Sequence, residues 1–449
     1  MSTAASTLVC AGCGASPSPT EPYPFRCPNS GVGDVDHVLV RVLDIPSVRF
    51  PDPQGIDPCP FVAYRELLHS YHRALAGGLD DARFVELVRS LDTAVSRVDG
   101  HGFRATPFTH SETLSTALGF AEPGGVWVKN EIDNVGGSHK ARHLMGVLLH
   151  LEVAELTGLA DRDQRPTLAV ASCGNAALAA AVVAAAGKRR LRVFVPVDAG
   201  VRIVDRLGDL DAEIVVCERR PGEPGDPTYL RLLNEIERGA LAFTCQGNLN
   251  GLAIEGGETL GYEIASQCET SGLTLDHVVV QVGGGALASS CAQAFTESQA
   301  LGRMDRVARI HTVQTTGAHP LERAYLKVRA TLPASPDAAE IDGALEGAAR
   351  SRSSYMWPWE SEPRSVAEGI LDDETYDWLE VVRAMLATGG QPVVVTEEGL
   401  VEAHQLGYDA GFNVSATGSA GLAGLAELLR AGAVRTDERV ALLFTGIER

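Results

Sequence analysis

The feature that most constrains the fold is a repeated unit of strand, tight polar turn and helix. Three such units begin near residues 126, 167 and 277, and each strand is short and rich in valine or alanine. Strands that alternate with helices need crossover connections, which place helices on both faces of a parallel sheet. The sequence therefore predicts an α/β fold of two parallel-sheet lobes with helices on both faces, in which ligands bind at the carboxyl ends of strands.

Length and composition divide the chain further. Its 449 residues exceed the usual size of one domain, and the 45% hydrophobic and 21% charged shares are ordinary for a globular protein. Prolines, glycines and cysteines crowd residues 1–60, which favours an N-terminal extension built as a ribbon-like arm outside the core. The pattern of residues 61–98 predicts two helices, over 62–75 and 80–95.

Charge and hydropathy exclude several classes of function. A net charge of −20 argues against a nucleic-acid partner, because binding the phosphate backbone requires a basic surface. The longest apolar run, residues 176–187, is too short to span a bilayer, and residues 1–10 lack the features of a secretory signal. Nine cysteines in a long chain suggest free thiols or ligands. We therefore expect a cytoplasmic protein with no membrane partner.

A turn of three glycines ends the strand that begins at residue 277. Gly283, Gly284 and Gly285 precede a helix, so their bare backbone and N–H groups could bind an anion such as a phosphate. A tight turn that needs glycine only for packing is the alternative. The spacing also resembles a dinucleotide fingerprint, but the next strand ends in Gln314 and not in an acidic residue. A nucleotide P-loop is disfavoured, since no Gly-Lys-Ser/Thr sequence follows.

Two further turns carry reactive groups. Residues 172–175, SCGN, expose a hydroxyl, a thiol and an amide at a strand end, where they could bind a carboxylate or merely cap the next helix. Lys140 lies near the start of a helix expected over residues 139–155. The positive potential of a helix N-terminus lowers the pKa of an amine, which favours a nucleophile. The alternative is a solvated surface lysine.

These stretches resemble one family of enzymes. VKNEIDNVGGSHKAR (128–142) is similar to the K-x-E-x-x-N-P-T-G-S-F-K-x-R stretch of the pyridoxal-phosphate enzymes of the tryptophan synthase β-like class, also called fold type II. SCGNAA (172–177) and QVGGGAL (281–287) look like the S-x-G-N-x-A and V-G-G-G-G-L loops of that class. NGLAIEGGETLGYEI (250–264) is similar to a run of threonine synthases, so threonine synthase and threonine dehydratase are the nearest members.

The resemblance implies a domain division and a cofactor. Residues 61–131 would hold helices and the start of the large lobe, residues 132–243 the small lobe and residues 244–449 the large lobe. Residues 1–60 would be a degenerate zinc-ribbon-like extension. The cofactor would be pyridoxal 5'-phosphate, the substrate a small amino acid and the assembly a homodimer.

The resemblance also implies roles for residues. Lys140 would hold the cofactor as an imine (Schiff base) and serve as the base that removes the Cα proton. The ring nitrogen would face the hydroxyl of Thr417, which we prefer, or of Ser419, and the ring hydroxyl would contact Asn175. Cys173 could act as an acid or base, or be a small filler. The phosphate would be bound by Gly283, Gly284, Gly285, Ala286 and Leu287. The substrate would be bound by Ser138, Ser172, Cys173, Gly174, Asn175 and Ala176.

A hydroxyl beside the ring nitrogen leaves the ring a weaker electron sink than a carboxylate would, so prompt loss of a leaving group is favoured. The resemblance therefore implies a lyase or synthase that abstracts the Cα proton of a small amino acid and performs β- or γ-elimination. Two alternatives stay open. One is β-replacement of the cysteine synthase type, and the other is a non-catalytic regulatory protein that binds the cofactor.

The cysteines of the extension suggest a metal site. Cys10-x-x-Cys13 followed by Cys27 resembles the zinc ribbon that precedes some threonine synthase-like chains. A closed zinc site needs four ligands, and Ser30 stands where a fourth cysteine is expected. His37 or Asp34 could complete the set. The alternative is a ribbon that no longer binds metal.

Overall fold

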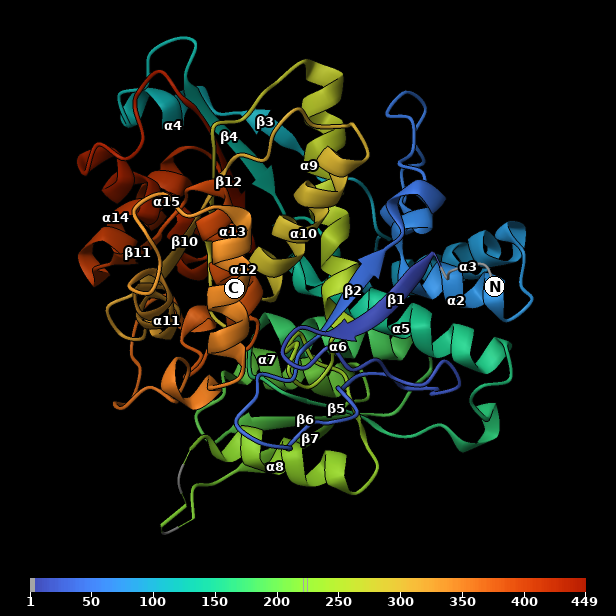
Figure 1. Ribbon diagram of the computed structural model, residues 1–449. Coiled ribbons are helices and arrows are strands. Elements are labelled where there is room, and N and C mark those ends of the chain that lie inside the picture. The colour runs from blue at the N-terminus through green and yellow to red at the C-terminus, as the bar shows by residue number, and fades with distance from the viewer. Residues whose placement is uncertain (1–4, 221, 224) are drawn as a thin grey trace.

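The computed structural model describes residues 5–220, 222–223 and 225–449, so residues 1–4 of the predicted extension lie outside the described part. It contains a large and a small parallel sheet surrounded by helices, with a strand pair from the N-terminal extension in front of them (Figure 1). This arrangement confirms the predicted α/β fold.

The large sheet has six strands in the order β11-β10-β9-β12-β4-β3, and only β3 is antiparallel to its neighbour. The small sheet has four parallel strands in the order β7-β6-β5-β8. The strands of the large sheet are β3 Phe108–His110, β4 Gly125–Asn130, β9 His277–Gln281, β10 Arg309–Thr315, β11 Pro392–Val395 and β12 Arg439–Phe444. Those of the small sheet are β5 Leu168–Ala171, β6 Leu191–Pro196, β7 Glu213–Cys217 and β8 Leu241–Ala242.

Helices flank both sheets. The α-helices are α1 Pro60–Ala63, α2 His69–Ala76, α3 Asp81–Asp99, α4 Glu112–Ala117, α5 Lys140–Leu156, α6 Asn175–Ala186, α7 Val201–Asp209, α8 Pro227–Glu237, α9 Ala253–Ser271, α10 Ala286–Ala300, α11 Pro320–Arg329, α12 Ala338–Ala349, α13 Trp378–Thr388, α14 Glu397–Asp409 and α15 Ala416–Arg430. Short 3-10 turns are η1 Ile45–Ser47, η2 Arg65–Leu67, η3 Val135–Gly137, η4 Arg162–Gln164, η5 Arg352–Ser354 and η6 Glu368–Ile370. Of the helices within the described residues, none is long and apolar enough to cross a membrane.

Strand β9 shows why both faces of the large sheet are covered. Successive side chains of a strand point to opposite faces. Val278 and Val280 pack in the apolar cluster that includes Trp378 of α13, whereas Val279 packs in the cluster that includes Leu422 of α15. All three valines are buried, which explains the uninterrupted apolar run in the sequence.

The first of the two helices predicted in residues 61–98 is interrupted. The expected helix over residues 62–75 is wrong, because the chain forms α1, then η2, and starts again as α2 at His69. The carboxylate of Glu255 on α9 accepts hydrogen bonds from the backbone N–H groups of His69, at 2.5 Å, and Ser70, at 3.2 Å. These contacts satisfy donors that a continuous helix would have bonded internally, so a distant residue provides the N-terminal cap.

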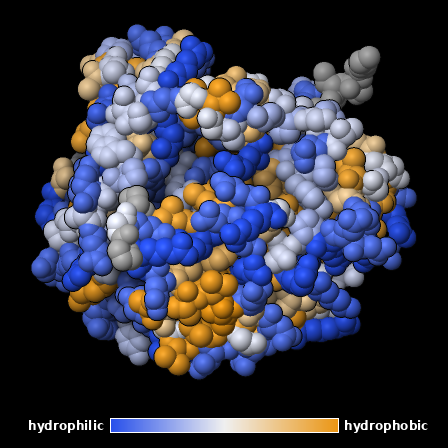
Figure 2. Space-filling view, turned by 90° about the horizontal axis from the view of Figure 1, so that it is seen from below, coloured by the Kyte–Doolittle hydropathy of each residue, from blue (hydrophilic) through white to orange (hydrophobic). Residues whose placement is uncertain are grey.

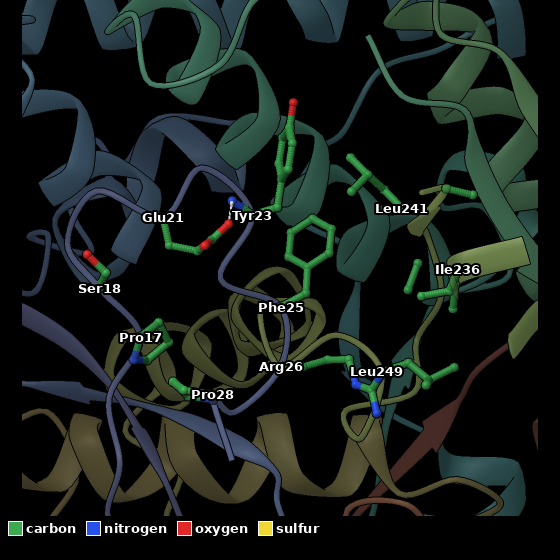
Figure 3. Close-up of a pocket in the computed structure, with 12 residues that line it drawn as sticks. Pro17, Ser18, Glu21, Tyr23, Phe25, Arg26, Pro28, Ile236, Leu241 and Leu249 are labelled. Atoms are coloured by element: carbon green, nitrogen blue, oxygen red, sulfur yellow. Dashed lines mark hydrogen bonds between the residues drawn. The ribbon is translucent and has the colours of Figure 1, made fainter. Parts of the chain in front are cut away.

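The N-terminal extension is docked on the core and is not a free arm. Its antiparallel strands β1 Ser6–Cys10 and β2 Leu39–Leu43 pair directly. Arg41 on β2 is buried, forms an ion pair with Glu258 and contacts Glu297 at 2.8 Å. The loop of residues 17–28 faces Leu241 and Leu249 across a cavity of about 440 Å³ (Figure 3). The extension therefore contacts both the α9–α10 pair and the small sheet.

The lobe boundaries at residues 131 and 243 stay predictions. All four strands of the small sheet fall between them, and the strands of the large sheet come from both sides of this interval.

Candidate active site

The predicted turns lie at the carboxyl ends of the parallel strands. The glycine turn follows β9 and leads into α10 at Ala286, and the SCGN turn follows β5 and leads into α6 at Asn175. Lys140 is the first residue of α5, and the residue before it, His139, donates its backbone N–H to Thr445 O at 3.1 Å. The loop that presents the lysine is thus fastened to the segment just after β12.

The glycine turn contacts an acidic side chain. Gly285 has φ +98°, a conformation that favours glycine. A Cβ on Gly283 would collide with the carboxylate of Asp372, and the N–H of Gly284 interacts with this carboxylate. Burial raises the pKa of Asp372 to about 6, and the Lys140 ammonium and the Gly284 N–H oppose that shift. A half-buried acidic side chain therefore contacts the turn and lies close enough to Lys140 to interact with its charge.

The residues that follow Asp372 also pack on the turn, and we call residues 372–377 (DDETYD) the acidic segment. Thr375 Oγ1 donates to Gly283 O at 3.0 Å, and the backbone N–H of Asp377 donates to Gly284 O at 3.0 Å. The ring of Tyr376 stacks on Tyr229 with centroids 6.1 Å apart. The acidic segment thus forms a wall of the site that the sequence reasoning missed.

The SCGN turn is open to solvent at Cys173. The protein around its thiol, together with Glu368 in η6, raises the pKa of Cys173 above its ordinary value, so the thiol stays protonated at neutral pH. Ser172 Oγ accepts from the Gly174 N–H at 3.3 Å. Asn175 Oδ1 accepts from Arg449 Nε at 3.0 Å, a contact that no sequence pattern indicated.

Three other predicted hydroxyls differ in their availability. Ser138 Oγ is buried and has no hydrogen-bond partner among the described residues, so its hydroxyl is available to a ligand. Thr417 Oγ1 accepts from the Gly369 N–H at 3.0 Å and retains its own proton for another acceptor. Ser419 Oγ donates to Ser415 O at 3.1 Å, within its own helix.

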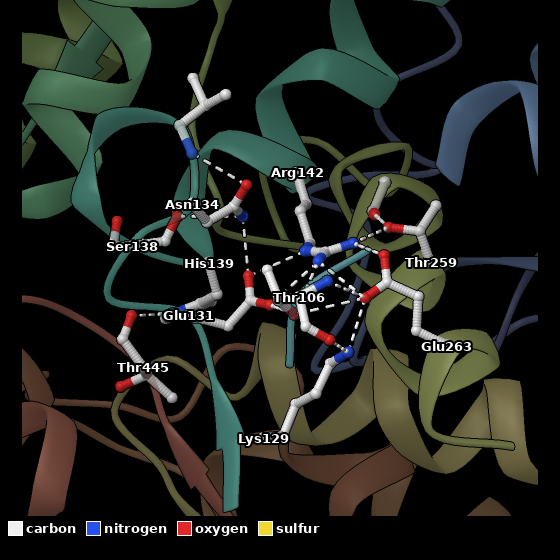
Figure 4. A network of polar contacts seen from close by, with 12 residues as sticks. Thr106, Lys129, Glu131, Asn134, Ser138, His139, Arg142, Thr259, Glu263 and Thr445 are labelled. Atoms are coloured by element: carbon white, nitrogen blue, oxygen red, sulfur yellow. Dashed lines mark hydrogen bonds and ion pairs between the residues drawn. The ribbon is translucent and has the colours of Figure 1, made fainter. Parts of the chain in front are cut away.

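A buried polar network lies beside the loop of residues 131–139, which leads to Lys140 (Figure 4). Arg142 forms ion pairs with Glu131 at 2.8 Å and with Glu263 at 2.6 Å, and Lys129 pairs with Glu263 at 2.6 Å. Asn134 Nδ2 donates to Glu131 Oε2 at 2.7 Å. Burial opposes ionisation, but Arg142 and Lys129 hold the pKa of Glu263 below its usual value. The network therefore fixes both ends of the loop that carries Lys140.

These network residues are the other polar positions of the VKNEIDNVGGSHKAR and EGGETLGYEI motifs, for which the sequence reasoning assigned no role. The signal was present as a basic and an acidic residue two apart, with a second acidic residue on the later helix. Gly256 of the second motif meets the backbone of Arg142, where a Cβ would overlap the carbonyl oxygen. This close approach of α5 and α9 brings Glu263 to the arginine.

The lysines of the chain leave one candidate for a covalent link. The sequence has four lysines, at 129, 140, 188 and 327. Lys129 is buried in the ion pair with Glu263, whereas Lys188 and Lys327 are exposed on other parts of the surface. Lys140 alone lies half-buried at the strand ends. An amine and a glycine turn at a helix N-terminus fit a ligand that carries an aldehyde and a phosphate.

The predicted metal ligands also come together. Cys10, Cys13, Cys27 and His37 place their ligand atoms within 4.8 Å of one another. The alternative fourth ligand, Asp34, is engaged elsewhere, because its carboxylate accepts from Ser353 N at 2.9 Å and from Ser353 Oγ at 2.7 Å.

Residues 101–446 match the family described as pyridoxal-phosphate dependent enzymes. The chain belongs to this family, and its cofactor is pyridoxal phosphate.

Within the family, the chain is similar to threonine synthase of Methanocaldococcus jannaschii, with 24% identity over 354 residues that cover 76% of this chain and 74% of that protein. It is 28% identical to L-serine dehydratase of Saccharomyces cerevisiae over 207 residues, or 45% of this chain and 59% of that one.

Solved structures share the fold. Threonine deaminase isoform 2 of Solanum lycopersicum aligns with a TM-score of 0.56 and 18% identity over 83% of this chain and 91% of that chain. Diaminopropionate ammonia-lyase of Escherichia coli aligns with a TM-score of 0.58 and 17% identity over 82% and 89%. The predicted fold type II architecture is thereby confirmed.

Proposed function

We propose that the protein is a pyridoxal-phosphate-dependent lyase that removes the Cα proton of a small amino acid and eliminates a β or γ substituent. The observation that carries the proposal is the position of Lys140 at the start of α5. Its neighbour His139 is bonded to Thr445, just after β12, and β12 pairs with β9, the strand that leads into the glycine turn. An amine and a glycine turn at a helix N-terminus match a ligand with an aldehyde at one end and a phosphate at the other.

The residues of the chain have distinct tasks in this proposal. Gly283, Gly284 and Gly285, with the start of α10, bind the phosphate through N–H groups and the helix dipole. Lys140 Nζ holds the cofactor aldehyde and, when substrate displaces it, takes the proton from Cα. The pyridoxal ring, when bound, stabilises the negative charge that remains at Cα.

The substrate carboxylate is held by the unpartnered hydroxyl of Ser138 and by the turn of Ser172 to Ala176. A β leaving group would depart with its electron pair from Cβ, whereas loss of a γ substituent would require that a Cβ proton be removed first. Thr417, whose hydroxyl proton is free, would face the ring nitrogen, and it carries no negative charge that would stabilise a protonated ring. The Ser419 hydroxyl is committed to its own helix, which supports Thr417 for this role. Cys173, with its raised pKa, is proposed as a protonated neighbour of the substrate.

The first experiment locates the covalent link. The purified protein is loaded with pyridoxal phosphate, reduced with borohydride and digested, and the modified peptide is identified by mass spectrometry. We expect the label on the peptide that contains Lys140 and none in the Lys140→Ala variant. Lys188→Ala and Lys327→Ala are matched controls that retain the label. Labelling confined to Lys188 or Lys327 would refute the assigned site.

The second experiment identifies the reaction. Serine, threonine and O-phosphohomoserine are screened for spectral shifts of the bound cofactor and for release of keto acid or phosphate. Keto-acid release supports elimination. Consumption of an added thiol without keto-acid release supports β-replacement, and spectral shifts without any turnover support the regulatory alternative.

The assembly and location are also proposals. A homodimer is supported by an apolar patch on the face seen from below (Figure 2). A cytoplasmic location is supported by the free state of the nine cysteines in the described part of the chain. Light scattering after size-exclusion chromatography tests the dimer.

A further inference from the structure

The N-terminal extension holds a cluster of four metal-ligand side chains. Cys10 ends β1, Cys13 lies three residues later, Cys27 ends the loop over the small sheet, and His37 precedes β2. Cys13 Sγ lies 3.5 Å from Cys27 Sγ, and Cys10 Sγ lies 3.7 Å from His37 Nδ1. Four ligands around a tetrahedral zinc ion, at about 2.3 Å from sulfur, stand about 3.8 Å apart. The spacing of the cluster fits this geometry.

The surroundings of the cluster orient its ligand atoms. His37 Nε2 lies 3.0 Å from Val32 O, so the ring donates there and leaves the Nδ1 lone pair directed at the cysteines. The Asn29 N–H donates to Cys27 Sγ at 3.3 Å, and Asn29 Nδ2 donates to Cys13 Sγ at 3.6 Å. Donors directed at sulfur stabilise thiolates that bind a metal. A Cβ on Gly12 would overlap Asp36 O, so the turn between the first two cysteines requires glycine.

We propose that Cys10, Cys13, Cys27 and His37 bind one structural zinc ion, and that this ion supports the wall of the cofactor site. The second part of the proposal rests on the proposed cofactor site and on a chain of contacts that begins beside His37. Asp36 Oδ1 accepts from Arg352 Nε at 3.1 Å, and another nitrogen of Arg352 pairs with Glu374 in the acidic segment. The acidic segment packs on Gly283 and Gly284.

The metal closes this chain of contacts at its outer end. The loop between Cys13 and Cys27 is bonded to the core by the Gly251 N–H, which donates to Phe25 O at 2.9 Å, and by His150 Nε2, which lies 3.0 Å from Pro22 O. Zinc therefore ties this loop to Asp36 and, through Arg352, to the acidic segment. Without the ion, Asp36 and Arg352 lose part of their restraint, and the glycine turn loses support.

The test of the metal site is stoichiometry in the full-length protein purified under reducing conditions. We expect about one zinc ion per chain by elemental analysis with inductively coupled plasma mass spectrometry. His37→Ala should fall below about one zinc in five chains, His37→Cys should retain the metal, and Asp34→Asn should behave as the wild type. Absence of zinc from the wild type, or an unchanged content in His37→Ala, would overturn the site.

The test of the coupling is the dissociation constant for pyridoxal phosphate, measured by absorbance titration. Chelation of zinc and Arg352→Gln should each raise this constant at least about threefold, and Arg352→Gln should keep its zinc. Arg350→Gln is the control, because the Arg350 side chain is exposed and its ion pair is with Glu346 on the same helix turn, away from the acidic segment's partner Arg352. Equal constants for all forms would overturn the coupling. A zinc-loaded wild type that binds no cofactor would instead refute the proposed function and the coupling, and leave the metal site intact.

Discussion

Asp377 provides a quantitative test of the acidic segment. The side chain is 3% exposed, and its Oδ2 atom has no hydrogen-bond partner among the described residues. Burial raises its pKa to about 8, the Gly247 N–H opposes the shift, Asp36 and Glu380 add to it, and Lys140 opposes it. The native carboxyl therefore keeps its proton over a range in which the unfolded chain, with a pKa of about 4, has lost it.

The sign and size of the effect follow from this difference. The stabilisation from this group is complete below the unfolded pKa near 4 and is lost as the pH rises through about 8. Each pH unit between those values corresponds to about 1.4 kcal/mol, so the wild type loses about 4 kcal/mol from this group between pH 5 and pH 8. Asp377→Asn keeps the shape of the protonated carboxyl and cannot ionise.

The assay is urea unfolding of wild type and Asp377→Asn at pH 5 to 9, followed by circular dichroism with and without pyridoxal phosphate. The variant should match the wild type within about 1 kcal/mol at pH 5 and exceed it by about 4 kcal/mol at pH 8 and above. Asp409→Asn, which changes an exposed carboxylate, should run parallel to the wild type. Parallel curves for Asp377→Asn as well would refute the assignment of a protonated native carboxyl.

Three further changes test the rest of the site. Asp372→Asn removes a negative charge from the glycine turn. The dissociation constant for pyridoxal phosphate should therefore fall about tenfold at pH 8 and change little at pH 5. An unchanged constant at pH 8 in absorbance titrations would contradict this expectation. Arg142→Met leaves Glu131 and Glu263 in the core without their main partner. The free energy of unfolding, measured in urea, should fall by about 3–5 kcal/mol. A decrease below about 1 kcal/mol would mean that the network is dispensable for stability. Cys173→Ser should keep kcat within about threefold of the wild type in steady-state assays, because a thiol with a raised pKa is a poor base. A decrease in kcat of about a hundredfold would instead assign a catalytic proton transfer to Cys173.

The sequence predicted those parts of the site that depend on local patterns. Gly283 to Gly285 and Ser172 to Asn175 lie at strand ends because short runs rich in valine or alanine alternate with helical patterns around them, and Lys140 begins its helix one residue from the expected start. Their assignment to one cofactor came from the resemblance of three motifs.

The parts that sequence reasoning missed depend on contacts between distant residues. Asp372 meets a turn almost ninety positions away, and nothing in DDETYD indicates that partner. The sequence alone leaves His37 and Asp34 as alternative metal ligands. The structure separates them, because Ser353 donates a hydrogen bond to the Asp34 carboxylate. The break between α1 and α2 likewise depends on Glu255, which is remote in the sequence. Local propensity carries no information on such partners.

The scarcity of lysine has a consequence for chemical selectivity. The chain carries 38 basic residues, of which all but four are arginine. Guanidinium groups stay protonated and do not condense with carbonyl compounds under conditions in which amines do. A reactive aldehyde that reaches this protein therefore encounters few competing lysine amines on the surface. This scarcity favours its reaction with Lys140, the one half-buried amine at the strand ends.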